Sequence, residues 1–294
     1  MNVLTVDDLT ADELATVLER AADYKADGAP DAMAGRTLAM IFEKPSTRTR
    51  VSFETGATQL GGHAIFLGPD DIHLGRGEPV RDTARAVSRY ADAVMARLFD
   101  HADVVEFGEY ATVPVVNGLT DMAHPCQTLA DLLTVRERFG GFDAEVAWVG
   151  DGNNVCQSLV LGAAMVGLEL TVATPAGHGV DGEVLDRAAE LGAAPETTTD
   201  PEAAVDGADV VYTDVWVSMG EEADREAKIE AFEAGGFRVD DDLAGDRTVM
   251  HCLPAHRGEE ITDAVIESDR AVVWDQAENR LHAQNALLAH LLDG

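Results

Sequence analysis

Short apolar runs alternate along the chain with longer segments whose apolar residues recur at helical spacing. In the first half, runs that suit buried strands occur at 37–42, 63–67, 93–98 and 113–116. Helix-length stretches at 46–60 and 80–90 separate several of these runs. A strand-then-helix rhythm of this kind predicts a parallel β-sheet flanked by helices.

Two local signals mark helix ends in this half. Thr10, followed three residues later by Glu13, has the pattern of a capping box, which predicts that a helix begins there. A long helix predicted over 128–139 runs into Gly140-Gly141, a pair typical of a helix end. This glycine pair is a candidate connection between two domains.

The same rhythm restarts in the second half. Strands are predicted at 146–149, 170–173, 210–213, 249–253 and 272–274, with helices at 154–166, 183–191, 223–234 and 259–267. A last helix is predicted over 277–292. The fold class is therefore α/β, with two domains, each a parallel β-sheet flanked by helices, spanning residues 1–130 and 131–276. In such folds ligands bind beyond the carboxyl ends of the strands.

The charge balance excludes several classes of protein. The 294 residues include 21 Lys plus Arg against 54 Asp plus Glu, a net charge of −33. A nucleic-acid binder needs a basic surface, and an anionic membrane surface also attracts basic segments. No run approaches the roughly 18 apolar residues of a spanning helix. We therefore expect a soluble protein with neither nucleic acid nor membrane as a partner.

The cysteines and the N-terminus indicate a cytoplasmic location. Cys126, Cys156 and Cys252 are odd in number and widely spaced, which argues against a disulfide framework. The Cys and His residues also lack the paired spacing of a zinc site. The N-terminal segment lacks the basic-then-apolar order of a secretory signal.

The segment 44–50 concentrates positive charge and hydroxyl groups at a predicted helix start. Lys44, Arg48 and Arg50 stand there with Ser46, Thr47 and Thr49, and no acid interrupts them. Free N–H groups and the helix dipole make such a start a candidate phosphate site. The alternative is that Ser46 simply caps the helix while Arg48 and Arg50 are solvated.

Read together with later motifs, this segment resembles the carbamoyl-phosphate loop of the aspartate/ornithine carbamoyltransferase superfamily. The other family landmarks follow in order: Met95-Ala96-Arg97, His124-Pro125-Cys126-Gln127, Asp151-Gly152-Asn153-Asn154, Asp214-Val215-Trp216-Val217-Ser218-Met219-Gly220, His251-Cys252-Leu253-Pro254 and Glu278-Asn279-Arg280. The resemblance spans nearly the whole chain. Two segments, Ser218-Met219-Gly220 and His251-Cys252-Leu253-Pro254, resemble the members that act on ornithine.

The resemblance implies a reaction in which the δ-amine of L-ornithine takes the carbamoyl group of carbamoyl phosphate, giving citrulline and phosphate. It implies that Ser46, Thr47, Arg48 and Thr49 hold the phosphate, and that Arg97 and His124 face the carbonyl oxygen. Gln127 and the Leu253 carbonyl would orient the carbamoyl NH2, with Arg280, Pro125 and Cys126 in the same site. Asn154, Asp214, Ser218 and Met219 would bind ornithine. Cys252 would lie beside the ornithine side chain and also contact carbamoyl phosphate. The expected catalytic residues are Arg48, Arg97, His124 and Cys252.

The resemblance also carries expectations about assembly. The first domain would bind carbamoyl phosphate, the second ornithine, and the active site would lie in the cleft between them. The last helix, 277–294, would pack back on the first domain, and the loop 218–224 is a candidate lid. His73 stands where the family's loop reaches the carbamoyl phosphate of a neighbouring subunit, in a homo-oligomer built from trimers. Neither a metal nor an organic cofactor is expected.

Three alternatives remain beside this interpretation. Gly150-Asp151-Gly152 after a predicted strand could belong to a dinucleotide-binding loop, although Val155 replaces the third glycine and no acid ends the next strand. A non-catalytic binding protein could share the fold. A transferase could use another amine, such as putrescine or N-acetylornithine.

The composition predicts that the folded state depends on salt. Only Lys25, Lys44 and Lys228 are lysines, and the remaining basic residues are arginines. A strongly acidic, lysine-poor surface is typical of proteins that work at high salt, where screening shrinks to about 3 Å at 1 M. We expect the circular dichroism signal to fall as KCl is lowered below about 1 M. A signal unchanged after dialysis into dilute buffer would refute this.

Overall fold

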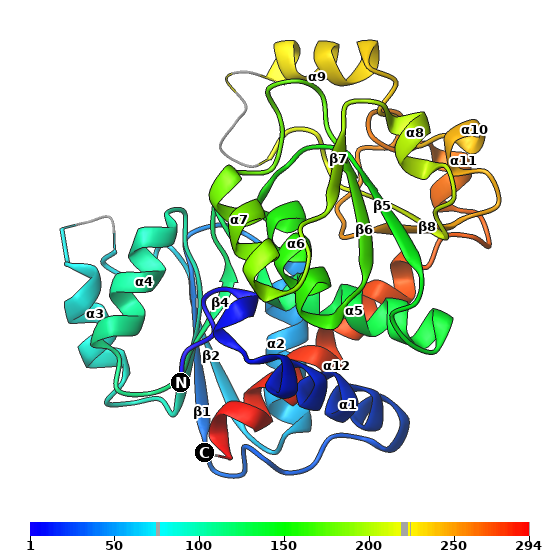
Figure 1. Cartoon of the computed structure of the whole chain (residues 1–294). Coiled ribbons are helices and arrows are strands. Elements are labelled where there is room, and N and C mark those ends of the chain that lie inside the picture. Colours follow the sequence, from blue (N-terminus) through cyan, green and yellow to red (C-terminus); the bar gives the residue numbers. More distant parts are fainter. Residues whose placement is uncertain (75–76, 219–222, 224, 294) are drawn as a thin grey trace. The chain divides into compact units, whose positions relative to one another are not determined.

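The computed structural model describes residues 1–74, 77–218, 223 and 225–293, and divides into two compact units (Figure 1). The first unit comprises 1–133 with 278–294, and the second comprises 134–277. Helices α5 (Pro125–Phe139) and α12 (Val273–Leu292) each belong partly to both units. The C-terminal part of α12 is therefore integrated into the first unit, beside residues 1–133.

The first unit is built on a parallel sheet in the order β2-β1-β3-β4. Its strands are β1 (Thr37–Phe42), β2 (His63–Leu67), β3 (Ala93–Arg97) and β4 (Val115–Leu119). Its helices are the short η1 (Val6–Asp8), α1 (Ala11–Asp27), α2 (Thr47–Gln59), α3 (Val80–Val87) and α4 (His101–Tyr110). In Figure 1, α3 and α4 lie on one face of this sheet, whereas α2 and α12 lie on the other.

The second unit is built on another parallel sheet, in the order β7-β6-β5-β8-β9. Its strands are β5 (Glu145–Val149), β6 (Glu169–Ala173), β7 (Glu196–Thr198), β8 (Val210–Thr213) and β9 (Thr248–His251). Its helices are α6 (Asn154–Val166), α7 (Gly182–Leu191), α8 (Pro201–Val205), α9 (Arg225–Ala234), α10 (Asp241–Ala244) and α11 (Asp263–Ile266). Two parallel sheets flanked by helices confirm the predicted fold class.

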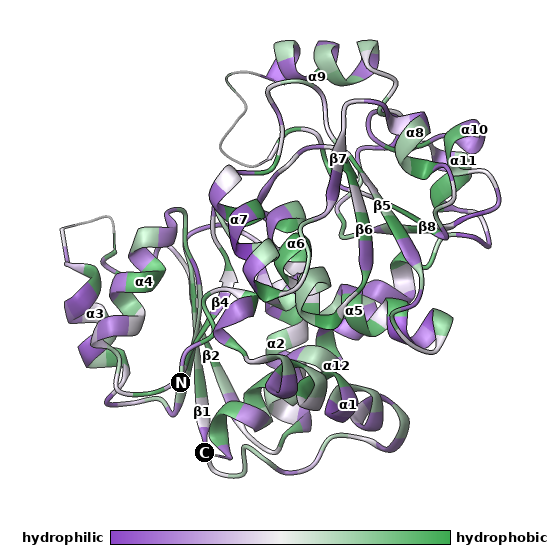
Figure 2. Ribbon diagram, in the orientation of Figure 1, coloured by the Kyte–Doolittle hydropathy of each residue, from purple (hydrophilic) through white to green (hydrophobic). Residues whose placement is uncertain are grey.

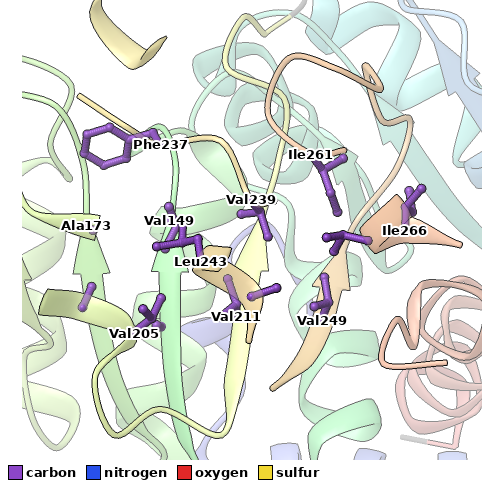
Figure 3. Close-up of a cluster of buried hydrophobic side chains, with 14 of the residues drawn as sticks. Val149, Ala173, Val205, Val211, Phe237, Val239, Leu243, Val249, Ile261 and Ile266 are labelled. Atoms are coloured by element: carbon purple, nitrogen blue, oxygen red, sulfur yellow. The ribbon is translucent and has the colours of Figure 1, made fainter. Parts of the chain in front are cut away.

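Apolar side chains fill the space between each sheet and its helices. In the second unit, Val149, Val211 and Val249 point from adjacent strands toward Val205 and Ile266 of the covering helices (Figure 3). Polar residues gather on the outer faces of helices, whereas the central strands are mostly hydrophobic (Figure 2). Burial of this apolar surface is the main favourable term that holds each layer on its sheet.

The strand orders place the sequence motifs at the two switch points. In the first sheet, β1 and β3 are neighbours whose connections leave in opposite directions, and the same holds for β5 and β8 in the second. The residues that follow these four strands therefore lie where open parallel sheets bind ligands. They include the start of α2 in the first unit, and Asn153 and Asp214 in the second, and Arg97 is the last residue of β3 at the same edge.

Some predicted elements are wrong or were missed. The strand predicted at 272–274 does not form: Ala271 makes one isolated bridge to Val249, and α12 begins at Val273. A three-residue apolar run cannot be told from a helix start by its pattern. The helix predicted over 259–267 is only α11, and α5 begins at Pro125 instead of residue 128. The elements α4, β7, α8 and α10 were not predicted.

The lengths and the hydrophobicity of the helices bear on whether the chain could span a membrane. Within the described ranges, none of the helices combines the length and the apolar character that crossing a bilayer requires.

Gly192 offers a test of the packing between α6 and the end of α7. A Cβ built there would lie 2.2 Å from the backbone oxygen of Ala164, an atom that cannot turn aside. We expect Gly192→Ala to lower the free energy of unfolding by about 1–3 kcal/mol. Urea unfolding in molar KCl measures it. Gly182→Ala is the matched control, because nothing lies within 4 Å of its Cβ position. A midpoint for Gly192→Ala at or above that of the parent chain would contradict the expectation.

Candidate functional site

The first group of candidate residues lies at the start of α2. Ser46 has extended backbone and caps the helix, its hydroxyl accepting a hydrogen bond from the Thr49 N–H at 3.2 Å. Thr47 is exposed, Arg48 is half-buried and Thr49 is buried. Arg50 instead stacks on the Phe66 ring, 3.8 Å from its centre, and pairs with Glu54. Arg50 is therefore a surface residue, whereas the other positions surround a helix N-terminus that favours anions.

Two further cations are buried near this helix start. Arg97, the last residue of β3, is 5% exposed, and its Nε has no hydrogen-bond partner among the residues that the structure describes. Burial, followed by the charges of Arg280 and Arg48, lowers the pKa of Arg97 to about 10. Lys44 is also buried, with its amine 4.5 Å from the centre of the Phe99 ring. Burial and then the charge of Arg97 lower the pKa of Lys44.

Arg280 of α12 connects three of the sequence motifs. One of its NH groups donates to Oε1 of Gln127 at 2.8 Å and lies 3.4 Å from Nε2 of His124. The other lies 3.4 Å from the hydroxyl of Thr49. The side chain of Gln127 is fixed in turn, since its amide donates to Asp131 at 2.8 Å. The geometry thus brings the helix start, the segment after β4 and the last helix to one place.

His124 is held in its neutral form. The side chain is buried, and desolvation lowers its pKa well below the usual value. The neighbouring charges of Arg280, Arg97 and Arg48 lower it further. Buried positive charges that repel one another are stabilised by an anion, since an opposite charge favours the charged form of each group. This place in the first unit can therefore bind a dianion and supply hydrogen bonds to a neighbouring carbonyl oxygen.

The remaining first-unit candidates differ in exposure. Pro125 opens α5 and is buried. Cys126 is fully buried, its thiol 3.5 Å from the Asn117 carbonyl, and burial raises its pKa to about 11. Its thiol therefore stays protonated at neutral pH. His73 is exposed in the single chain, with its Nδ1 3.9 Å from Glu78.

Asp214 is the centre of the second group of candidates. It follows β8 and is 5% exposed. One carboxylate oxygen accepts a hydrogen bond from the side-chain amide of Asn153 at 2.9 Å, and the other from the thiol of Cys252 at 2.8 Å. Asn153 also caps α6, accepting from the N–H groups of Val155 and Cys156. The carboxylate is therefore fixed by donors from two other motifs.

The other ornithine-binding candidates lie around Asp214 in the sequence or on α6. Asn154 starts α6 and Ser218 follows β8, and both are half-buried. Met219 and most of the candidate lid lie outside the described residues. Leu253 follows Cys252 with φ 59°, a left-handed conformation that costs a leucine about 1–3 kcal/mol. Hydrogen bonds must hold this turn.

A buried ion pair supports the same end of the second sheet. The Lys228 amine of α9 donates to the Asp151 carboxylate at 2.8 Å, and both side chains are more than nine-tenths buried. Nδ1 of His178 lies 3.7 Å from the other Asp151 oxygen. Removing one partner of such a pair leaves an uncompensated buried charge. Lys228 thus ties α9 to the residues that follow β5.

Two clusters of described residues have the proximity of a metal site: Asp214 with His251 and Cys252, and the more exposed His256 with Glu259 and Glu260. Ligand atoms of Asp214, His251 and Cys252 lie within 4.8 Å of one another. His251, however, uses one ring nitrogen to accept the Leu253 N–H and the other to contact Glu260. In this arrangement its ring has no lone pair left for an ion.

Both units of the chain are similar to known carbamoyltransferases. Residues 1–137 match the family model "Aspartate/ornithine carbamoyltransferase, carbamoyl-P binding domain", and residues 143–291 match its "Asp/Orn binding domain". The chain belongs to the aspartate/ornithine carbamoyltransferase family. An ornithine carbamoyltransferase of Haloquadratum walsbyi is 63% identical over 294 residues, covering 99% of this chain and 97% of the relative.

Solved carbamoyltransferase structures are also similar throughout. The ornithine carbamoyltransferase of Pyrococcus furiosus has a TM-score of 0.94 and 51% identity, covering 100% of this chain and 97% of that one. An N-acetyl-L-ornithine transcarbamylase complexed with PALAO has a TM-score of 0.89 and 31% identity, with 99% of both chains covered. Identity to this second enzyme is lower than to the first.

Gly152, in the loop after β5, has a packing explanation. A Cβ at Gly152 would lie 2.5–2.6 Å from the backbone of Gly179 and Val180. The Gly152 N–H also donates to the His178 carbonyl. The close approach of this loop to Gly179 and Val180 is sufficient to explain why glycine stands at position 152.

Several supporting residues were not predicted. Asn153 could have been found, because an asparagine just before a predicted helix is a strong N-cap signal. Lys228 had no signal in the sequence, since its partner Asp151 lies in a separate element. Asp131 stands four residues after Gln127 in the same helix, a spacing at which helical side chains meet. His251 is fully buried, and nothing in the sequence linked it to Glu260 nine residues later.

The shifted pKa of His124 gives a pH-dependent prediction. We expect its ring 15N signals to stay those of a neutral histidine as the pH falls from 8 to about 6.5 and below. The unfolded chain takes up this proton near pH 6.5, so the folded state loses stability relative to it as the pH falls further. His124→Asn assigns the signals, and the same titration in urea is the control. A folded-state midpoint near 6.5 would contradict this.

Proposed function

We propose that the chain is an ornithine carbamoyltransferase, which transfers the carbamoyl group of carbamoyl phosphate to the δ-amine of L-ornithine. The observation that carries this proposal is the contact of Arg280 with Thr49, His124 and Gln127 beside the buried Arg97. The printed names of the most similar relatives and structures support the choice of ornithine.

The chemistry requires positioning and charge stabilisation more than a covalent intermediate. The lone pair of the neutral δ-amine forms a C–N bond with the carbonyl carbon, and negative charge grows on the carbonyl oxygen. The C–O bond to phosphate then breaks with its electron pair on the phosphate, and the nitrogen loses a proton. The products are citrulline and phosphate.

The first-unit residues suit the carbamoyl phosphate end of this reaction. Ser46, Thr47 and Thr49 at the helix start, with Arg48, would hold the phosphate. Arg97 and His124 would donate to the carbonyl oxygen, His124 as a neutral imidazole. Gln127 accepts from Arg280 with one lone pair of Oε1, and the second lone pair remains for the carbamoyl NH2.

The second-unit residues suit an amino acid. Asp214 provides a buried carboxylate for the α-ammonium group, and Cys252, which donates to it, would lie beside the ornithine side chain. Asn154, Ser218 and Met219 would bind the polar head. The Leu253 carbonyl would accept from the carbamoyl NH2. The interdomain location of the active site, the lid at 218–224, the trimeric building block and the cross-subunit role of His73 stay predictions.

An assay of the ureido product in molar KCl tests the function directly. We expect product with carbamoyl phosphate and L-ornithine, and far less with aspartate, putrescine or N-acetylornithine. We expect Arg48→Gly to lower turnover by about 10²–10³ or more, because it removes a charged donor from the phosphate site. Arg50→Gly is the matched control, since Arg50 stacks on Phe66 instead.

Each outcome has a clear meaning. Product with putrescine or N-acetylornithine in preference to ornithine would replace the proposed substrate, and no product with any amine would favour a non-catalytic role. Turnover of Arg48→Gly equal to that of Arg50→Gly would refute the assignment of Arg48.

A further inference from the structure

Gln284 is a fully buried residue of α12 whose side chain contacts the guanidinium of Arg280. Its amide oxygen accepts from Nε of Arg280 at 3.0 Å and from a terminal nitrogen of the same group at 2.9 Å. Its amide nitrogen donates to the Ser52 hydroxyl of α2 at 2.7 Å. The opposite amide orientation would set an NH2 group against two N–H donors, so the hydrogen bonds determine this one. Gln284 therefore links Arg280 to α2.

The Ser52 hydroxyl leads back to the start of the same helix. It donates to the Thr49 carbonyl at 3.3 Å, which leaves its lone pairs to accept from Gln284. The terminal nitrogen of Arg280 that contacts Gln284 also lies 3.4 Å from the Thr49 hydroxyl. These four residues form a closed set of contacts. A change in the direction of the guanidinium would therefore break several of them at once.

Helices α2 and α12, on the same face of the first sheet (Figure 1), meet along a polar seam. The amide nitrogen of Asn285 donates to the Gln59 side-chain oxygen at 3.0 Å, and its oxygen fills the place where a Cβ of Gly56 would lie. Hydrogen bonds are directional, whereas apolar packing is not. The seam therefore fixes the register of α12 on α2. Its α2 members have the spacing of one helix face: Thr49, Ser52, Gly56 and Gln59.

The acceptor that Gln284 offers to Arg280 carries no charge. Charged side chains are almost never fully buried unless they are paired, and carboxylates match the planar fork of arginine. Gln284, Gln127 and Thr49 instead orient this guanidinium with uncharged oxygen atoms. Contacts of this kind fix direction without cancelling positive charge. Burial, followed by the charge of Arg280, lowers the pKa of Arg97, in agreement with a charge that is still felt nearby.

We propose that Gln284 is a positioning residue that fixes the direction of Arg280 while leaving its charge intact for an anion, an inference that rests on the proposed function for the identity of that anion, carbamoyl phosphate. Gln284 does not need to touch substrate. Its amide meets two requirements together, because the oxygen accepts two N–H groups and the nitrogen holds α2. An apolar residue of similar length fails the first requirement, and a carboxylate would cancel the charge.

Two substitutions separate the direction of Arg280 from its charge. Gln284→Glu keeps acceptor oxygens, and the Ser52 hydroxyl can turn to donate, but it adds negative charge beside the guanidinium. We expect the Kd of inorganic phosphate to rise about ten- to hundredfold, as for loss of one hydrogen bond from a charged group, with the free energy of unfolding little changed. Gln284→Met removes the acceptor, and we expect a rise of about tenfold in this Kd and in the carbamoyl phosphate KM.

The matched controls are the same two substitutions at Gln59. This residue lies farther along the seam and contacts Asn285, so Gln59→Glu and Gln59→Met change the α2–α12 packing or the local charge without touching Arg280. We expect both to bind phosphate as the parent chain does. Calorimetric titration with inorganic phosphate in molar KCl measures each Kd, and urea unfolding in the same buffer measures stability.

A measurement on the guanidinium needs neither turnover nor ornithine. We expect the Nε–H signal of Arg280, assigned with Arg280→Lys, to exchange slowly with solvent in the parent chain and in Gln284→Glu. In Gln284→Met we expect exchange to be about tenfold faster, because the acceptor of that N–H is lost. Unchanged exchange in Gln284→Met would overturn the proposal.

Failure of the proposed function and failure of this role give different results. No product with ornithine, together with the expected phosphate affinities and Nε–H exchange, would refute the proposed function and leave the role of Gln284 intact. Phosphate affinities that follow only the loss of stability, alike in the Gln284 and Gln59 variants, would show packing alone and overturn the proposal. If Gln284→Met does not fold, Gln284→Glu decides, since a phosphate Kd equal to that of Gln59→Glu would also overturn it.

Discussion

The burial of positive charge beside a neutral histidine is the constraint on which the first unit depends. Arg97 lies at the end of a central strand, and burial together with Arg280 and Arg48 lowers its pKa to about 10. Arg280 is oriented by a hydroxyl and an amide oxygen, Thr49 and Gln127, which hold it without cancelling its charge. The apolar layers on both faces of the sheet supply the favourable free energy that keeps these side chains in place. An anion relieves their mutual repulsion, so binding and local stability are coupled here.

In the second unit, the buried charged side chains that follow β5 and β8 are carboxylates, so the protein must stabilise negative charge there instead of positive charge. Asp214 accepts from an amide and a thiol, whereas Asp151 is compensated by the Lys228 ammonium. The donors to Asp214 are uncharged, so its negative charge is not cancelled and can attract a cation. The Asp151–Lys228 ion pair, in contrast, has no net charge. The two carboxylates at neighbouring strand ends are therefore suited to different tasks. Under the proposed function Asp214 would bind the α-ammonium group of ornithine, whereas Asp151 anchors α9.

The sequence predicted features that depend on short stretches of chain, and it failed where partners come from separate elements. The central strands and the cap at Ser46 follow from local apolar runs and a hydroxyl before a helix. The segment 272–274 was misassigned because three apolar residues fit a strand or the start of α12 equally well. The contact of His251 with Glu260 could not be predicted, since the intervening turn follows no period that reveals which side chains meet.

The net charge of −33 acts over longer distances than the buried cations Arg97 and Arg280, which act only on groups in contact with them. Surface carboxylates repel one another through solvent, and about 1 M salt screens that repulsion beyond roughly 3 Å. Arg97 is buried, so ions in solution screen its interactions with a bound anion much less. A phosphate that reaches the start of α2 therefore meets donors at contact distance, where screening has little room to act. Salt removes the long-range barrier raised by the acidic surface and leaves the short-range attraction largely intact, which lets one chain combine an acidic surface with a site for an anion.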